Sequence, residues 1–385
     1  ALPISYRWSK ILRVLCLDIE GGFGGSSRSL FFSLKHLDRS KIDVSAWCKR
    51  DGPIQQLYEE AGIKSGVYPD MPKVSGLPRT SRNVVMFGLF AVDWLMAKGF
   101  RDAFYDALDG VDLVHFNHEA LFWLARDMKR RKPKPAAMHI RTNIWRNIFA
   151  KHQSRIVAEN TDARIFITEN ERETMSRNAG FPVDGDILHN IVEPSPLGTL
   201  PWELDDSFAH RKSFLVGCLS NYAWLRGTDR LIDLAVLLKK AGRDDIGFVV
   251  AGNVNLTRSL PGLLGRIARQ GGGLDEYARQ CGVADMFTFT GHVSEPERIL
   301  AAVDAVIKPT REANPWGRDI LEAMAAGKPV ISVGRYDRFV ETGATGILQP
   351  HWDVGALVDA MAQLADNEKE TERMASLAKD RVAEY

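Results

Sequence analysis

A polar loop that leads into a helix carries the residues best suited to chemistry. The loop, Pro309 to Trp316, follows the apolar strand Ala305–Ile307 and precedes a helix expected from Gly317 to Ala326. Such a loop lies at the carboxyl edge of a parallel sheet, where open α/β sheets bind ligands. The unpaired N–H groups and positive dipole end of a helix start suit a phosphate. Glu322, one turn into the helix, offers a carboxylate to sugar hydroxyls, and phosphate plus sugar describes a sugar nucleotide.

Strand-like apolar runs alternate with helical patterns along the chain, which predicts βαβ units and parallel sheets. The first set of expected strands is Leu12–Ile19, Asp43–Cys48, Asp112–Phe116, Ala136–Ile140, Ala163–Ile167 and Ile187–His189. The second set is Phe214–Cys218, Gly247–Ala251, Met286–Thr290, Ala305–Ile307, Val330–Val333 and Gly346–Leu348. A Pro-rich, acidic stretch between the two sets indicates a linker, which we place at residues 196–212.

The length of 385 residues suits two domains. We therefore expect two α/β domains of Rossmann-like type, 1–195 and 213–370, whose parallel sheets face a cleft between them, followed by a helix over 371–385.

Composition narrows the class of protein. Hydrophobic residues make up 45% of the chain and charged residues 26%, as in soluble globular proteins. No apolar run is long enough to span a membrane. Four scattered cysteines without a Cys-x-x-Cys pair argue against zinc ribbons and disulfide frameworks, and indicate a reducing, cytoplasmic compartment. The net charge is only +1, so we expect no nucleic-acid partner.

The segment around Glu322 resembles the donor-site motif of the family-4 retaining glycosyltransferases, which have the GT-B fold and use sugar nucleotides. Their motif is Glu-x7-Glu followed by Ala-Met/Leu-Ala and a Gly-x-Pro turn, which Glu322-Ala323-Met324-Ala325 and Gly327-Lys328-Pro329 match. The family spacing places Asn314 where the first glutamate stands, and Glu312 lies two residues earlier. The resemblance implies that Glu322 holds the ribose and that Asn314 or Glu312 faces the donor sugar.

A second loop of the same domain corresponds to the cations that clamp the diphosphate in that family. The family has Gly-Arg at a strand end and Lys-Gly a few residues later. Here Cys218 replaces the arginine, while Arg226, directly before Gly227, takes the lysine position and can hold phosphate with two hydrogen bonds. Three other cations could replace the missing one: Lys308, Arg311 and, best placed at the helix start, Arg318. The donor-binding candidates of this domain are Ser220, Asn221, Arg226, Gly227, Gly252, Gly317, Arg318, Asp319, Ile320 and Glu322.

The first domain offers glycines and histidines at its strand ends. Gly24 and Gly25 match the Gly-Gly loop that lies under the donor diphosphate in the family, whereas the G-x-G-x-x-G spacing of an NAD site is absent. The resemblance places His139 near the donor sugar, although a histidine satisfied within the core is an open alternative. It places three residues after another strand on the acceptor side: His115, Asn117 and His118.

We expect no metal and no cofactor, with the nucleoside-diphosphate sugar as co-substrate. Asp184-Gly185-Asp186 imitates an Asp-x-Asp metal motif but lies in a turn, where carboxylates are common.

The resemblance implies retaining transfer of a sugar, a hexose for example, to a hydroxyl of a glycan, lipid-linked or polysaccharide-precursor acceptor. Two alternatives stay open: a nucleotide-sugar epimerase on the same fold, and a non-catalytic sugar-nucleotide-binding protein. An aromatic helix predicted from Met86 to Leu108 is expected to face the core, but members of the family often contact the inner face of a membrane through the first domain.

Overall fold

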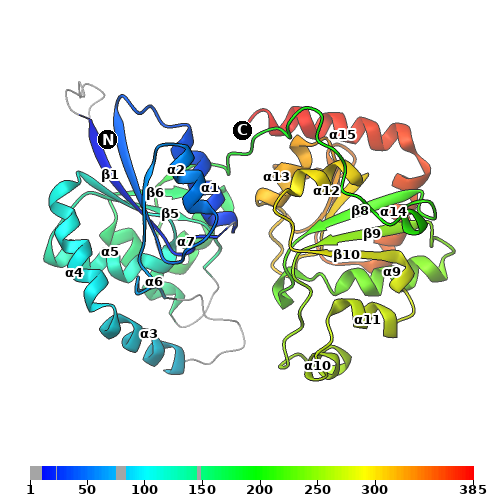
Figure 1. Cartoon of the computed structure of the whole chain (residues 1–385), viewed down its shortest axis with the longest axis horizontal. Helices are drawn as coiled ribbons and strands as arrows, with labels where there is room; N and C mark the ends of the chain where they lie inside the picture. The colour runs from blue at the N-terminus through cyan, green and yellow to red at the C-terminus, as the bar shows by residue number, and fades with distance from the viewer. Residues whose placement is uncertain (1–10, 23, 75–83, 145–148) are drawn as a thin grey trace. The chain divides into compact units, whose positions relative to one another are not determined.

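The computed structural model describes residues 11–22, 24–74, 84–144 and 149–385. The chain divides into two compact units, Ala1–Ile191 and Val192–Tyr385, and each is built on one parallel sheet (Figure 1). The stretch predicted as a linker, 196–212, lies in the second unit. There the backbone N–H of Trp202 donates to the Arg298 carbonyl (2.9 Å), and a short helix, α8 (Asp206–Ala209), forms.

The first unit contains a seven-stranded sheet in the order β3-β2-β1-β4-β5-β6-β7, with every pair parallel. Its strands are β1 (Leu12–Asp18), β2 (Ile42–Cys48), β3 (Lys64–Val67), β4 (Leu113–Phe116), β5 (Ala136–Ile140), β6 (Ala163–Phe166) and β7 (Asp186–Ile187). Alternate residues of β1 belong to different apolar clusters: Leu15 and Leu17 to one, Val14 and Cys16 to the other. Both faces of the sheet are therefore covered, which explains the near-continuous apolar run in β1.

The helices of the first unit are α1 (Gly25–Lys35), α2 (Ile54–Glu60), α3 (Val84–Met96), α4 (Lys98–Ala107), α5 (Phe122–Arg131), α6 (Ala150–Asn160) and α7 (Glu169–Ala179). The prediction of one helix from Met86 to Leu108 is wrong, because the chain breaks at Ala97 into α3 and α4. The break lets α4 bury Phe100 and Phe104 in the core, while Leu95 at the end of α3 is 71% exposed.

The second unit contains a six-stranded parallel sheet in the order β10-β9-β8-β11-β12-β13. Its strands are β8 (Phe214–Leu219), β9 (Ile246–Ala251), β10 (Phe287–Gly291), β11 (Ala305–Lys308), β12 (Val330–Val333) and β13 (Gly346–Gln349). The remaining helices are α9 (Arg230–Lys240), α10 (Gly262–Arg269), α11 (Leu274–Gln280), α12 (Pro296–Ala302), α13 (Arg318–Ala325), α14 (Val354–Asp366) and α15 (Glu368–Val382).

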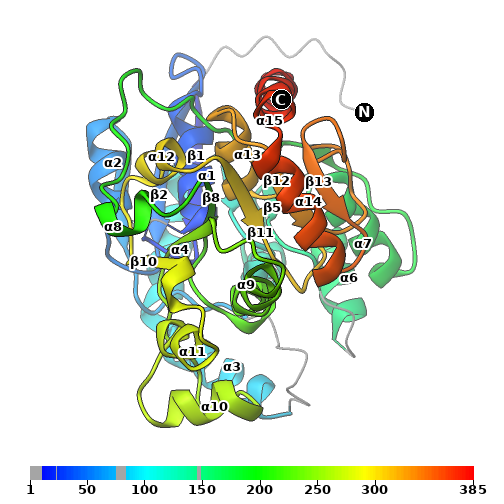
Figure 2. The ribbon, with the colours of Figure 1, turned by 90° about the vertical axis from the view of Figure 1, so that its right-hand side faces the viewer.

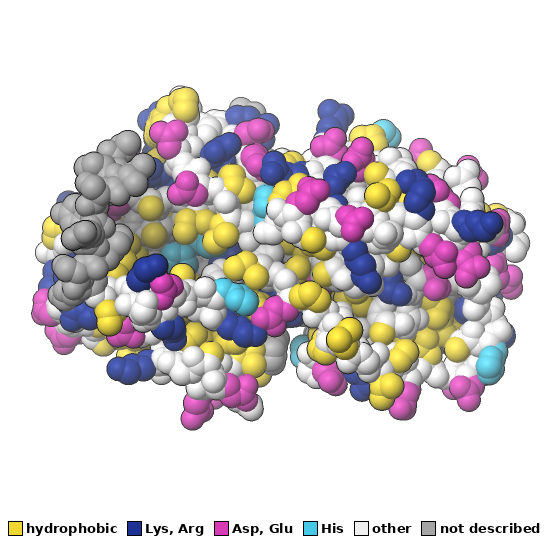
Figure 3. All heavy atoms as spheres, turned by 90° about the horizontal axis from the view of Figure 1, so that it is seen from above, with side chains coloured by type: hydrophobic (Ala, Val, Ile, Leu, Met, Phe, Trp, Pro, Cys, Tyr) yellow, Lys and Arg dark blue, Asp and Glu magenta, His cyan; other side chains and the backbone are white. Residues whose placement is uncertain are grey.

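Helices cover both faces of this second sheet. Phe214, Val216 and Cys218 of β8 point into a cluster with α9, α11 and α14, while α12 contacts β8 and α13 contacts β11 and β12. The C-terminal helix α15 packs against α13, as Figure 2 shows. Within the described ranges, no helix combines the length and hydropathy that a membrane crossing requires. On the face drawn in Figure 3, basic and acidic side chains are interspersed rather than gathered by sign.

Candidate functional site

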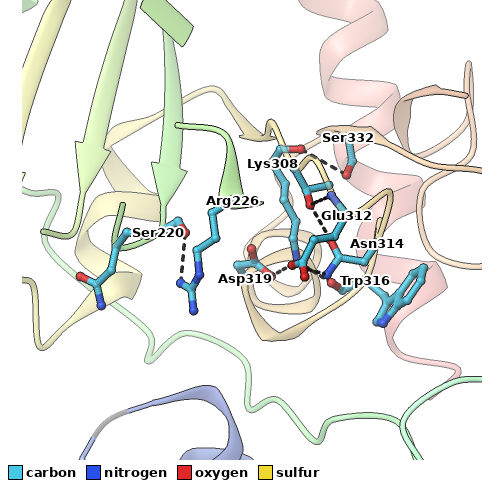
Figure 4. A network of polar contacts seen from close by, with 10 residues as sticks. Ser220, Arg226, Lys308, Glu312, Asn314, Trp316, Asp319 and Ser332 are labelled. Carbon is cyan, nitrogen blue, oxygen red and sulfur yellow. Dashed lines mark hydrogen bonds and ion pairs between the residues drawn. The ribbon is translucent and has the colours of Figure 1, made fainter. Parts of the chain in front are cut away.

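The start of α13 is built around Gly317. Its φ of 128° favours glycine, and a Cβ there would come within 2.8 Å of Asp319 Oδ1 and 3.0 Å of Lys308 Nζ. As the N-cap residue of α13, Gly317 has no side chain with which to cap the helix. Lys308 Nζ instead donates to the Trp316 carbonyl (2.5 Å) and to Asp319 Oδ1 (3.1 Å), which ties the loop to the first turn of the helix (Figure 4).

Glu322 and Arg318 form an ion pair one turn apart on α13. Nε and Nη2 of Arg318 donate to Glu322 Oε1 at 3.1 and 2.8 Å, and the two side chains are only 6% and 12% exposed. The carboxylate predicted to hold a ribose is thus oriented by a guanidinium. Arg318, expected as the best replacement for the missing cation, is engaged with Glu322, and Ile320 between them is fully buried.

The loop before α13 brings together Glu312 and Asn314, the two candidates for the residue that faces the donor sugar. Thr310 Oγ1 donates to Asn314 Oδ1 (2.7 Å) and accepts the Glu312 N–H (3.0 Å). The chain then turns through Ala313, whose φ is 50°, so that Asn314 Nδ2 lies 3.5 Å from Glu312 Oε2 (Figure 4). Glu312 therefore places a carboxylate beside the position at which the family spacing puts Asn314.

Arg226 lies in the loop after β8, at the end of a 3-10 helix, Trp224–Arg226. Gly227 follows with φ 75°, and its Cβ would come within 2.0 Å of the Pro309 carbonyl oxygen, so only glycine fits. The Arg226 side chain is exposed, and its Nη1 donates to Ser220 Oγ (3.1 Å; Figure 4). This loop thus crosses the one that carries Glu312 and leaves a guanidinium at the surface.

Three other predicted donor-binding residues meet at the same strand ends. Asn221 Oδ1 accepts the Asn253 N–H (2.7 Å). The φ of Gly252 is 138°, and a Cβ there would come within 2.6 Å of the Ser220 carbonyl oxygen. The close approach of β8 and β9 at this point requires the glycine.

Two other cations predicted as candidates for the diphosphate form ion pairs with carboxylates of this edge. Lys308 pairs with Asp319, and Arg311 pairs with Asp229. Cys218 is 1% exposed in the core, and burial raises the pKa of its thiol to about 12. An arginine at position 218 would therefore enter the core rather than join Arg226 at the surface.

The corresponding edge of the first unit is a buried polar network. Asn117 is fully buried; its Oδ1 accepts from Nε and Nη2 of Arg141 at 3.1 and 2.6 Å, and its Nδ2 donates to the Ser26 carbonyl (3.1 Å). Glu119, 3% exposed, accepts the Arg141 N–H (2.9 Å) and the Thr142 hydroxyl. The Asn117 side chain, predicted to lie on the acceptor side, thus connects β4, α1 and Arg141.

The histidines of this edge are also mostly enclosed. His139 is 2% exposed, its ring centroid lies 5.9 Å from that of His115, and its Nε2 has no hydrogen-bond partner among the described residues. Burial and the charge of Arg141 lower the pKa of His139 well below its usual value and that of His115 to about 3, so both rings are neutral near pH 7. His118 Nδ1 accepts the Ala120 N–H (3.1 Å).

Gly24 and Gly25 lie at the start of α1 and are exposed. A Cβ at either position would meet no protein atom within 4 Å, so packing does not require glycine there. Their approach to a ligand stays a prediction. Within the part of the chain that the structure describes, no three His, Cys, Asp or Glu side chains gather as a metal site would need.

Sequence reasoning missed the buried side-chain pairs that hold both edges, Arg311–Asp229 and Arg141–Asn117. The only signal was that these polar residues follow strand ends, which does not say which partners meet.

Comparison with known proteins agrees with this fold. Residues 23–195 match the family described as Glycosyltransferase Family 4, and residues 202–381 match Glycosyl transferases group 1. Among solved structures, HepE of Anabaena in complex with UDP and glucose superposes with a TM-score of 0.72 at 18% identity, covering 97% of this chain and 95% of that one. Sucrose-phosphate synthase from Thermosynechococcus elongatus superposes with a TM-score of 0.65 at 15% identity, covering 97% and 94%.

Two curated relatives match parts of the chain. Alpha-D-kanosaminyltransferase of Streptomyces kanamyceticus is 26% identical over 240 residues, 60% of this chain and 58% of that protein. Phosphatidyl-myo-inositol mannosyltransferase of Mycobacterium leprae (strain TN) is 30% identical over 124 residues, 31% of each. The chain therefore spans less than two thirds of the length of these relatives.

Two Rossmann-like units, each with a parallel sheet covered by helices, define the GT-B fold. One family match covers each unit, and together the two matches identify the chain as a glycosyltransferase of the GT-B type.

Proposed function

We propose that this protein is a retaining glycosyltransferase that moves a sugar from a nucleoside diphosphate to an acceptor hydroxyl. The observation that carries the proposal is the edge of the second sheet. There the loop after β8 carries an exposed guanidinium, Arg226, and the adjoining loop after β11 leads into α13, which starts at a glycine and carries the oriented carboxylate of Glu322. The UDP and glucose held by HepE support a sugar-nucleotide donor.

Each group has a chemical task in this proposal. Arg226 and the N–H groups at the start of α13 neutralise the charge that develops on the departing diphosphate. Glu322 accepts hydrogen bonds from the ribose, and Arg318 fixes the direction of its carboxylate. Glu312 and Asn314 face the donor sugar. Such a transfer depends on orientation and charge stabilisation more than on covalent participation by the protein.

The first unit is proposed to bind the acceptor, a glycan or a lipid-linked precursor. Val92, Leu95 and Met96 of α3 are 56%, 71% and 75% exposed, which supports peripheral contact between this helix and a membrane surface. Sedimentation with anionic lipid vesicles, compared between the wild type and Leu95→Ser/Met96→Ser, tests that contact. Equal binding by both proteins would remove α3 from the proposal.

A thermal-shift screen against UDP-, GDP-, ADP- and dTDP-sugars, followed by product analysis, tests the function. We expect one base to stabilise the protein and an acceptor-dependent glycoside with the donor's anomeric configuration. An altered sugar nucleotide formed without acceptor would indicate an epimerase, and binding without any product would indicate a non-catalytic protein. Inversion at the anomeric carbon would exclude the retaining mechanism.

Metal independence is part of the same proposal, because protein cations take the role of a metal at the diphosphate. Activity should persist in EDTA. Loss of activity that manganese restores would contradict this and direct attention to Asp184 and Asp186.

A further inference from the structure

We propose that Arg311 is a positioning residue that clasps the Arg226 loop to the Glu312 loop, an inference that rests on the proposed function. Those loops follow β8 and β11, which are neighbours in the sheet. Strand pairing between them stops at Val306↔Gly217, two residues before the end of each strand. The relative position of the two loops must therefore be set by contacts other than the sheet ladder.

Backbone contacts supply the first part of the clasp. The N–H of Arg311 donates to the Leu225 carbonyl (2.8 Å), directly before Arg226. From the other side, Nη1 of Arg230 donates to the carbonyls of Pro309 and Thr310 at 3.2 and 3.0 Å. The two loops are therefore in contact on both sides of Arg226.

The Arg311 side chain supplies the second part. Its Nη1 and Nη2 donate to the two carboxylate oxygens of Asp229 at 2.8 and 2.5 Å. Asp229 is 3% exposed, and the Arg311 side chain is 16% exposed. A forked pair of this kind fixes geometry as well as charge, and a lysine cannot reproduce it.

The third part is a contact with Trp224. Arg311 Nη1 donates to the Trp224 carbonyl (2.7 Å), and the guanidinium carbon lies 3.6 Å from the centre of the indole ring. The guanidinium therefore contacts the 3-10 helix that ends in Arg226 through the backbone carbonyl and the indole ring of Trp224. Because this group is enclosed by Asp229 and Trp224, it positions the diphosphate cation rather than acting as one.

Kinetics of Arg311→Lys test the role through Arg226. The change should lower kcat/KM about tenfold in the otherwise wild-type protein, since it removes one charge-assisted hydrogen bond and loosens the loop. In an Arg226→Ala background the same change should have less than about a twofold effect, because residues that act through one another are not additive. Equal factors in both backgrounds would show that Arg311 does not act through Arg226.

Arg243→Lys is the matched control. Arg243 is also a forked arginine of the second unit, with Nε and Nη2 donating to Asp245 at 2.9 and 3.0 Å and a side chain 18% exposed. It has no place in the proposed site. Its substitution should leave kcat/KM within about twofold of wild type, so a loss equal to that of Arg311→Lys would mean that any weakened pair impairs the enzyme.

Amide hydrogen exchange of the unliganded protein gives a readout that needs no turnover. Arg311→Lys and the near-isosteric Asp229→Asn should each speed exchange about tenfold or more at residues 223–229 and 311–316, while Arg243→Lys should not. Unchanged exchange in both clasp variants would overturn the proposal. If the wild type turns over no sugar nucleotide, the proposed function fails, and this exchange still decides the clasp.

Discussion

The two sheets end in polar residues of similar kind but opposite accessibility. At the edge of the first sheet, Arg141, Asn117 and Glu119 are buried and bonded to one another. At the edge of the second sheet, three cation–carboxylate pairs are partly or largely buried, and Arg226 is left exposed beside them.

The difference distinguishes residues that support the fold from residues that are available for chemistry. Buried ions need partners, because desolvation of an unpaired charge is costly. In the second unit, the pairs around Arg226 and Glu312 fix the loops, and the proposed function assigns the ligand contacts to those two groups. In the first unit, Arg141, Asn117 and Glu119 are buried, and their effect on function is to shape the surface that surrounds them.

The comparison predicts its largest effect at Arg141, and on stability rather than chemistry. Arg141→Met should cost about 3–5 kcal/mol of unfolding free energy, because it removes two hydrogen bonds from a charged donor, each worth about 1.5–3 kcal/mol, and leaves the Asn117 amide oxygen buried without them. Urea denaturation measures the cost. Arg131→Met, which removes a side chain 66% exposed beside Asp127, is the control. Equal stability of the two variants would mean that the network is not a structural support.

Arg226 should show the reverse behaviour. Arg226→Ala should lower kcat about a hundredfold or more, as removal of a stabiliser of developing charge costs about 2.7–4 kcal/mol in the barrier. Its melting temperature should stay close to wild type, since the side chain is exposed. A silent Arg226→Ala together with an inactive Arg318→Ala would place the diphosphate at the start of α13 alone.

Glu322 tests the ribose contact. Glu322→Gln should weaken nucleoside-diphosphate binding by about 1–3 kcal/mol, the scale of hydrogen bonds to a charged group. The glutamine keeps an acceptor for Arg318, which limits the loss of stability that Glu322→Ala would add. Calorimetry showing unchanged affinity would remove Glu322 from the site.

The enclosed histidines of the first edge predict a smaller, pH-dependent effect. In the unfolded chain, His115 takes up a proton as pH falls below about 6.5, whereas burial holds its folded pKa at about 3. The unfolded state then binds more protons, so stability falls with pH across that window, by up to about 1.4 kcal/mol per pH unit for each such histidine. Asp18, whose pKa burial raises, acts in the opposite sense.

Urea denaturation between pH 6 and pH 5 isolates the histidine contribution. His115→Asn should make the pH dependence shallower, and the exposed His210→Asn should leave it unchanged. Identical slopes for His115→Asn and the wild type would contradict the lowered pKa of this half-buried ring.

Strands of this fold could be predicted from the sequence where burial on both faces requires a continuous run of apolar residues. Such runs mark β1, β8 and β12. By contrast, β3 (Lys64–Val67) was missed because this edge strand is short and mostly exposed, so neither length nor pattern marks it. The division of α3 from α4 was missed because both segments are rich in aromatic residues.

The candidate site was predictable as a motif and not as a geometry. The spacing around Glu322 and Arg226 follows the chain and can be read from it. The Arg311–Asp229 pair joins residues 82 positions apart, and one sequence carries no information about which distant charges meet. For the same reason the sequence does not show that Lys308, Arg311 and Arg318 are each paired with a carboxylate.

Hydrogen exchange with and without the nucleoside diphosphate that stabilises the protein tests the central claim most directly. Ligand should slow exchange at residues 220–229 and 309–322, the loops that carry Arg226, Glu312 and Glu322. Protection confined to the first unit, with both of these segments unchanged at saturating ligand, would contradict the assignment of the donor site to the edge of the second sheet.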